Sequence, residues 1–313
     1  MEYDVVSIGN ANIDIVVYVK KVPEADEAIE AFDYAMSPGG SASNFAVSAQ
    51  LMGAKACFVG CVGEDYFGEM VLSGFRSAGV SVEYVKFSKK PTGIVFIIVG
   101  EEGVRRMIAY RGANLDLEPG DLRGELFDKT KIVHVASVRI GIALKASVEA
   151  SRRGLKFSYD PGFSATERGI EALKPILSRT HVLYLNTREL ANLVGVDDPL
   201  AAEKILPYGP KIIVVKLGSR GSFIVTKYEK IHVPPYRPMK VVDTTGAGDV
   251  FAAAFTIGLL EGYSLHDSAL LGSIAAGIKI SGKGARSNIP DRRRVFEVFE
   301  KVKRKLESEI RLF

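Results

Sequence analysis

Six short apolar runs recur along the chain, and the segments between them have the pattern of helices. Each run is apolar without a break, which indicates a strand that is covered on both faces, as in a parallel sheet with right-handed crossover helices. The expected fold class is therefore α/β, with a central, mostly parallel sheet flanked by helices. The six runs are Val5–Gly9, Ala56–Gly60, Ile132–Ala136, Lys156–Asp160, Val182–Asn186 and Ile212–Lys216.

Two segments break this rhythm. Between Ile13 and Met36, apolar residues alternate with others, and between Thr92 and Gly112 two strand-like runs flank a turn at residues 100–103, which predicts a hairpin. Such an antiparallel excursion should form a small β-sheet lid over the carboxyl ends of the parallel strands, where ligands bind in open α/β folds. We expect residues 1–11, 37–90 and 113–313 to form a large α/β domain, and residues 12–36 and 91–112 to form the lid.

The string Asp243–Asp249 (DTTGAGD) precedes an apolar stretch that runs from Val250 to Leu260. Its two glycines allow a tight turn that brings successive amides together, and the following helix adds the positive end of its dipole, so the site suits a phosphate. Asp249 is either only a helix cap or the base for a second, neutral substrate. The second reading predicts phosphoryl transfer to a hydroxyl.

This string resembles the second signature of the ribokinase family of carbohydrate kinases, also called the PfkB family. Further resemblances lie in the order that the family has, from Val5 to Pro290. They are Asn10–Asp14, similar to the sugar-binding start, Gly39–Asn44, similar to the first signature, Asn186–Glu189, similar to the NxxE element, and Lys216–Gly221 (KLGSRG), similar to the nucleotide loop.

The resemblance implies a ribokinase-like fold and ATP-dependent phosphorylation of a fructose- or ribose-like monosaccharide. Asp249 would be the base, and the amides of Gly246, Ala247 and Gly248 the anion hole. Sugar contacts are expected from Asn12, Asp14, Gly39, Gly40, Asn44, Arg106 and Ser137, and nucleotide contacts from Asn186, Glu189, Lys216, Gly218, Gly221 and Thr245. Mg²⁺ is expected near Asn186 and Glu189, directly or through water, and a monovalent cation such as K⁺ near Asp243, Thr245, Gly284 and Asn288.

Three positions limit these expectations. Ser137 stands where ribokinase-like members carry an acidic sugar contact, and Lys216 stands where many relatives have a threonine. Arg106 is either an ordinary exposed charge or a contact to an anionic or polyhydroxy substrate.

Other functions remain open alternatives. A nucleoside kinase of the same family would need an aromatic shelf, which Phe32, Tyr34, Phe96 and Tyr110 could supply unless they pack the lid or a subunit contact. A non-catalytic sugar sensor would tolerate loss of Asp249, which is present. A Walker-type NTPase is disfavoured because no GxxxxGK[ST] occurs, and a dinucleotide oxidoreductase because Gly9–Asn12 lacks the glycine pattern.

Composition bounds the partners. The formal net charge is +4, and the basic tail at residues 291–311 has the spacing of an amphipathic helix more than that of a nucleic-acid patch. No stretch is apolar enough to span a bilayer, so we expect a cytoplasmic protein with no nucleic-acid or membrane partner. Cys57 and Cys61 share one predicted strand, about 13 Å apart, and cannot form a disulfide.

The lid strands predict a homodimer. One of their faces should cover the site, and the other should expose the alternating apolar residues Ile13, Ile15, Val17, Ile94, Phe96 and Ile98. An uncovered apolar sheet is a poor surface for a monomer.

Overall fold

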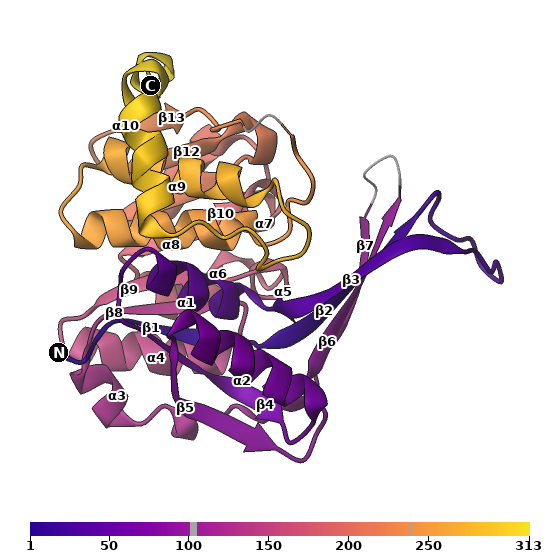
Figure 1. The fold of residues 1–313 in the computed structure, drawn as a ribbon. Helices are drawn as coiled ribbons and strands as arrows, with labels where there is room; N and C mark the ends of the chain where they lie inside the picture. The colour runs from indigo at the N-terminus through magenta and orange to yellow at the C-terminus, as the bar shows by residue number, and fades with distance from the viewer. Residues whose placement is uncertain (101–104, 238–239) are drawn as a thin grey trace.

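A computed structural model describes residues 1–100, 105–237 and 240–313 of the chain. A ten-stranded sheet runs through its main body (Figure 1). In spatial order the strands are β14 (Arg311–Leu312), β13 (Lys230–Val233), β12 (Ser222–Thr226), β11 (Ile212–Lys216), β10 (Val182–Asn186), β9 (Lys156–Asp160), β8 (Thr130–Ala136), β1 (Tyr3–Gly9), β4 (Ala56–Gly63) and β5 (Ser81–Ser88). The seven strands from β11 to β5 are parallel to one another, and β12 to β14 are antiparallel. The predicted mostly parallel sheet is confirmed.

Helices cover both faces of this sheet and bury two separate apolar clusters against it. On one face lie α1 (Ser41–Leu51), α2 (Tyr66–Ala78), α8 (Ala247–Leu260), α9 (Leu265–Lys279) and α10 (Arg292–Glu309). On the other lie α3 (Gly124–Asp128), α4 (Ile140–Arg152), α5 (Phe163–Thr166), α6 (Gly169–Leu177) and α7 (Thr187–Val194). Short 3₁₀ segments are η1 (Gly112–Asp116), η2 (Pro119–Asp121), η3 (Pro199–Tyr208) and η4 (Gly218–Arg220). Because apolar side chains fill both faces, the central strands carry the continuous apolar runs seen in the sequence.

A second, four-stranded sheet projects from the main body (Figure 1). Its order is β3 (Ala31–Gly39), β2 (Asn12–Val19), β6 (Gly93–Gly100) and β7 (Arg105–Tyr110). The two outer pairs are antiparallel, as predicted, whereas the central pair, β2 and β6, is parallel. Of the predicted hairpin turn at residues 100–103, all but Gly100 lies outside the described residues. The division of the chain into a large domain and a lid stays a prediction.

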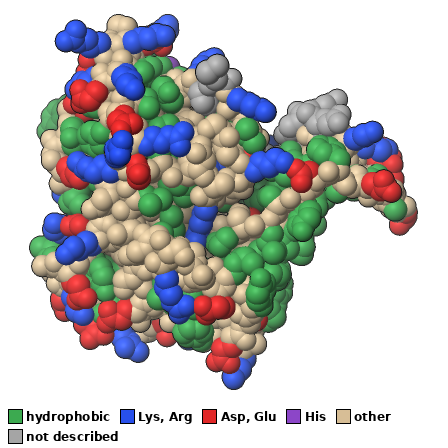
Figure 2. Space-filling model, viewed as in Figure 1, with side chains coloured by type: hydrophobic (Ala, Val, Ile, Leu, Met, Phe, Trp, Pro, Cys, Tyr) green, Lys and Arg blue, Asp and Glu red, His purple; other side chains and the backbone are tan. Residues whose placement is uncertain are grey.

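The two faces of this small sheet differ. Register places Met36, Ile15, Phe96 and Ile108 side by side across the four strands, on the face that the sequence predicted to be apolar and exposed. Of the six residues predicted to be exposed, only Phe96 is exposed, with Met36 and Ile108 exposed beside it, whereas Ile13 is buried against the main body. Figure 2 shows hydrophobic side chains gathered along the projecting sheet. The opposite face turns toward the carboxyl ends of the main sheet, with Val95 and Ile97 buried on it.

Two sequence expectations about single segments are confirmed. Cys57 and Cys61 both lie in β4, buried and unpaired, and the basic tail forms the amphipathic helix α10, which buries Val295, Phe299 and Leu306. In the ranges that the structure describes, no helix has the length and apolarity that a membrane crossing requires.

Candidate active site

A cavity of about 1110 Å³ lies where the small sheet faces the main body. Its walls come from the carboxyl ends of β1, β8 and β9, from the inner face of the small sheet, and from the N-terminal turns of α1 and α8. The predicted site residues Asn12, Asp14, Gly40, Asn44, Ser137, Thr245, Gly246, Gly248 and Asp249 all line it. The structure thus brings predicted residues from four distant parts of the chain to one place.

Asp249 lies in the first turn of α8, next to the first turn of α1. The Asn44 amide donates a hydrogen bond to its carboxylate (Nδ2 to Oδ2, 2.8 Å), and Arg286 donates in turn to the Asn44 side-chain oxygen (3.3 Å). Burial raises the pKa of Asp249 to about 6, although the Lys216 charge and the Asn44 hydrogen bond act in the opposite direction. Asp249 therefore holds a proton more readily than a free aspartate does.

Asp14 is the second carboxylate of the cavity. Burial, and then the charge of Asp249, raise the pKa of Asp14 to about 7, while Arg286 opposes this shift. Arg286 is itself affected, because burial lowers the pKa of its guanidinium to about 10. It also donates to the Ser43 hydroxyl and lies over the Phe75 ring, 4.8 Å from the ring centroid. Arg286 thus serves as the cation shared by both carboxylates, a role that the sequence motifs did not assign.

The N-terminus of α8 presents the predicted anion hole. Gly246 has φ +77°, and a Cβ there would lie 2.7 Å from the Ala285 carbonyl oxygen, so only glycine fits this turn. The Ala247 amide donates to the Thr244 carbonyl (3.2 Å), whereas the amides of Gly246 and Gly248 have no hydrogen-bond partner within the described residues. Two of the three predicted amides are therefore available to an anion.

Beside this helix end, a buried ion pair joins Lys216 and Asp160 (2.6 Å). A Cβ added at Gly248 would lie 3.5 Å from the Lys216 ammonium, which places that charge next to the turn. Burial and the charge of Asp160 raise the pKa of Glu189, while Lys216 lowers it. The sequence did not single out Asp160 as a member of this ionic cluster. The one indication was its position at the carboxyl end of a predicted strand.

Asn186 and Glu189 form a reciprocal capping box at the start of α7. Each accepts a hydrogen bond from the backbone amide of the other (2.9 and 2.8 Å). The NxxE element therefore caps a helix in this structure, and one Glu189 carboxylate oxygen takes no part in the capping box. Gly218 and Gly221 lie at the two ends of η4, after β11. Neither belongs to the described residues that line the cavity.

The residues at which a monovalent cation was predicted make hydrogen bonds within the protein. The Asp243 carboxylate accepts hydrogen bonds from Thr245 (2.8 and 2.7 Å) and from the Gly284 amide (2.9 Å). The Asp243 carbonyl accepts from the ammonium group of Lys279 (3.1 Å), a fully buried residue. The Asn288 side-chain amide donates to the Ile278 carbonyl and the Ser281 hydroxyl. A cationic side chain thus contacts Asp243, one of the four residues at which the sequence predicted K⁺.

The other predicted sugar contacts lie as follows. Asn12 accepts a hydrogen bond from Asn114 (2.8 Å), a buried residue that the sequence did not single out. A Cβ at Gly39 would collide with the Asp14 carboxylate, and one at Gly40 with the Asn10 carbonyl, so both glycines permit close strand crossing. Ser137 lines the cavity with φ +53°.

Arg106 is the exception among the predicted sugar contacts. It pairs with Ile98, and the residues of β6 that line the cavity are Val95 and Ile97, so Arg106 lies on the opposite face and is exposed. Met107 and Ala109, its neighbours in β7, face the cavity instead. Side chains alternate between the two faces of a strand, so the register of β7 decides which face Arg106 lies on. The sequence alone does not give that register.

The predicted aromatic shelf for a nucleoside base is likewise turned outward. Phe32, Tyr34, Phe96 and Tyr110 are all exposed. In the described part of the chain, none of them belongs to the cavity walls. Of the two alternatives that the sequence left open, the structure therefore favours packing of the lid or of a subunit contact over a shelf for a base.

Comparison with known proteins decides the family. A family model described as "pfkB family carbohydrate kinase" matches residues 3–292. The chain belongs to this family. It is a carbohydrate kinase, a phosphotransferase with an alcohol group as acceptor.

Individual relatives match along most of the chain. An uncharacterized sugar kinase of Archaeoglobus fulgidus is 32% identical over 242 residues, which cover 76% of this chain and 96% of that one. A ribokinase of Lactococcus lactis is 32% identical over 311 residues, 98% of each chain. The structure of Arabidopsis thaliana ribokinase complexed with ribose and ATP has a TM-score of 0.85 and 28% identity, over 96% of this chain and 99% of its own. The nucleoside kinase of Methanocaldococcus jannaschii has a TM-score of 0.80 and 26% identity, over 96% and 99%. The ribokinase-like fold is confirmed.

Proposed function

We propose that this kinase transfers the γ-phosphoryl group of ATP to a hydroxyl of a fructose- or ribose-like monosaccharide. The observation that carries the proposal is the start of α8. There, a buried carboxylate with a raised pKa and two amides without partners open into one cavity with the polar side chains of β2. An acid–base group beside an anion site suits attack by a neutral hydroxyl on a phosphoryl group.

In the proposed reaction the hydroxyl oxygen bonds to the γ-phosphorus as the bond from that phosphorus to the bridging oxygen breaks, and ADP leaves with that oxygen. The hydroxyl proton goes to Asp249. Its pKa of about 6 makes it a better base than a free aspartate while leaving it ionised at neutral pH. Asn44 orients the carboxylate through its amide. Most of the acceleration comes from positioning and charge stabilisation.

The ionic cluster of Lys216, Asp160 and Glu189 supports binding of the nucleotide next to α8. Lys216 offers a cation to a phosphate. The charge of Asp160 helps to raise the pKa of Glu189, and Mg²⁺ would relieve this accumulation of negative charge. We assign Asn186 and Glu189 to hold this ion through water. When bound, Mg²⁺ neutralises phosphate charge.

A nucleoside is the second candidate acceptor, and one observation favours it. Val95, Ile97, Met107 and Phe163 line the cavity and offer an apolar surface to a base. This surface differs from the exposed aromatics that the sequence suggested.

An assay of ADP formation dependent on the acceptor tests the proposal. The panel contains fructose, ribose, 2-keto-3-deoxygluconate, fructose 6-phosphate and nucleosides, each with ATP and Mg²⁺. Asp249→Asn keeps the shape of the side chain and removes its basicity, so turnover should fall by a factor of 10² or more. Binding of ATP, measured by calorimetry, should change only a few fold. An Asp249→Asn protein with more than a tenth of wild-type turnover would remove Asp249 from the role of base.

Two attributes follow from the same proposal. A homodimer formed through the small sheets is supported by the exposed apolar side chains of their outer faces. Use of ATP supports a cytoplasmic location.

A further inference from the structure

Three arginines line the cavity in addition to its two carboxylates. Arg111 follows β7, Arg139 precedes α4, and Arg168 precedes α6. These segments are neighbours, because the Arg111 guanidinium donates to the Ser164 hydroxyl (3.3 Å) in α5. A Cβ at Gly162 would in turn lie 2.6 Å from the Ser137 hydroxyl oxygen, two residues before Arg139.

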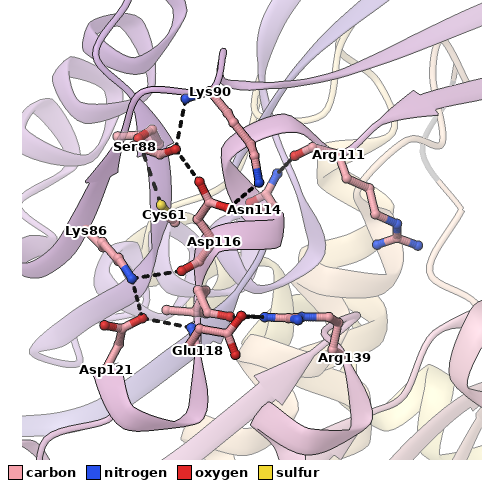
Figure 3. A network of polar contacts seen from close by, with 12 residues as sticks. Cys61, Lys86, Ser88, Lys90, Arg111, Asn114, Asp116, Glu118, Asp121 and Arg139 are labelled. Carbon is pink, nitrogen blue, oxygen red and sulfur yellow. Dashed lines mark hydrogen bonds and ion pairs between the residues drawn. The ribbon is translucent and has the colours of Figure 1, made fainter.

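Two of these three guanidiniums carry charge that the protein does not neutralise. Arg139 donates to Glu118 (2.8 Å) and to the Leu117 carbonyl. Figure 3 shows Arg139 aimed at Glu118, while the Arg111 guanidinium extends away from that network. Within residues 1–100, 105–237 and 240–313, no ion pair joins Arg111 or Arg168 to a carboxylate. The cavity wall thus holds arginine charge that no carboxylate of the described residues pairs with.

We infer that the acceptor is an anionic monosaccharide, with a phosphate or carboxylate group remote from the hydroxyl that attacks. This inference rests on the proposed function. Guanidinium groups bind both anions through paired, charge-assisted hydrogen bonds, whereas the hydroxyl end of a sugar matches Asp14, Asn12 and Asn44. Because the phosphates of the nucleotide are assigned to the start of α8, Arg111 and Arg168 remain for the acceptor.

Matched acceptors test this inference. Initial rates are compared for ribose with ribose 1-phosphate and ribose 5-phosphate, and for fructose with fructose 6-phosphate. 2-Keto-3-deoxygluconate provides the carboxylate arm. We expect kcat/KM at least about tenfold higher for one anionic acceptor than for its neutral counterpart. Arg168→Ala and Arg111→Ala should each raise the KM for that acceptor about tenfold and change the KM for ATP little, whereas Arg304→Ala, at an exposed position of α10, should change neither.

Equal or faster turnover of the neutral sugars would overturn the inference and leave the proposed function intact. Failure of every acceptor in both panels would overturn the proposed function itself. The two failures are therefore distinguishable.

A second, independent observation concerns Lys279. It is the last residue of α9, its side chain is fully buried, and its ammonium donates to the Asp243 carbonyl (3.1 Å). Its charge also lowers the pKa of the Asp243 carboxylate, against the effect of burial and together with the hydrogen bonds from Thr245 and Gly284. A buried ammonium requires oxygen partners, and here the partner is the first residue of the turn that leads to Gly246.

The geometry assigns to the Lys279 ammonium the place of the monovalent cation expected at this turn. A covalently held +1 charge fixes the Asp243 carbonyl and, through Asp243, the Thr245 amide that leads into the anion hole. Lys279 is thus a positioning residue. The kinase should have no requirement for K⁺.

Activity of the wild-type protein is measured in buffers with K⁺, Na⁺ or tetramethylammonium as the only monovalent cation, and rates should agree within about twofold. Lys279→Met should lower kcat at least about tenfold, and K⁺, ammonium or methylammonium should restore part of it. Lys279→Arg should keep more activity than Lys279→Met, because it keeps the charge. Lys301→Met, at an exposed position of α10, is the control.

Circular dichroism and thermal melts establish that each variant is folded, so that a loss of kcat reports on the site. Severalfold activation of the wild-type protein by K⁺ would overturn the assignment. A folded Lys279→Met protein that is fully active without these cations, or that no cation restores, would also overturn it.

Discussion

Replacing Asp14 by asparagine should stabilise the protein and do so more strongly at alkaline pH. Asp14 is 6% exposed, and burial together with the Asp249 charge raises the pKa of its carboxyl to about 7. An aspartate in an unfolded chain has a pKa of about 3.9. Ionising Asp14 therefore costs the folded state more than the unfolded state, and stability is lost as the pH rises from about 4 through 7.

The magnitude follows from linkage. A shift from about 3.9 to about 7 costs about 1.5 kcal/mol of unfolding free energy at pH 5 and about 4 kcal/mol at pH 8. Asparagine has nearly the same shape and is neutral throughout, so Asp14→Asn should recover this cost. At about 2 °C per kcal/mol for a chain of this size, the gain in Tm at pH 8 should exceed the gain at pH 5 by about 5 °C.

Differential scanning calorimetry of the wild-type and Asp14→Asn proteins at pH 5 and pH 8 provides the measurement. Asp197→Asn, a change at an exposed aspartate, is the matched control and should show no such pH dependence. A gain in Tm that is equal at both pH values, or larger at pH 5, would refute the reasoning, because it would mean that Asp14 is ionised in the folded protein throughout this range.

Three further predictions concern the site and the assembly. Because protonation disables Asp249 and its pKa is about 6, kcat/KM should fall about tenfold per pH unit below pH 6; a flat profile to pH 5 would contradict this. Gly246→Ala should lower Tm and turnover, since its Cβ would lie 2.7 Å from the Ala285 carbonyl oxygen, whereas Gly248→Ala, whose Cβ meets Lys216 no closer than 3.4 Å, should keep the wild-type Tm; the reverse order would show that the turn is not as described. Sedimentation at micromolar concentration should give a dimer, and a species of 33.9 kDa alone would exclude it.

The strands that the sequence located best are those in the middle of the main sheet. The structure has β9, β10 and β11 at the predicted bounds, because each is a short apolar run covered on both faces. The edge strand β5 escaped notice, since it is only half-buried and carries Glu83 and Lys86. The pair β12 and β13 was also missed, because its antiparallel register depends on contacts that no single segment contains.

The site shows the same division between local and long-range information. The start of α8 could be predicted because its chemistry lies within seven consecutive residues. Arg286 and Asp14 are 272 positions apart, and only the folded chain reveals their shared electrostatics. Lys279 carried one signal, a charge at the end of a helix that is apolar on all sides. Arg106 failed for a different reason, because one step of strand register moves a side chain to the other face.

The chain crosses between the main body and the small sheet at four points, at residues 9–12, 39–41, 88–93 and 110–112, so Asp14 in β2 and Asp249 in α8 belong to different parts of the fold. The small sheet lies over the cavity and buries Asp14 there, within reach of the Asp249 charge. A displacement of the small sheet that exposed Asp14 would lower the pKa of its carboxyl, because burial is the main cause of the raised value. Such a displacement would release a proton near neutral pH, and mildly acidic conditions would favour the arrangement in which Asp14 is buried.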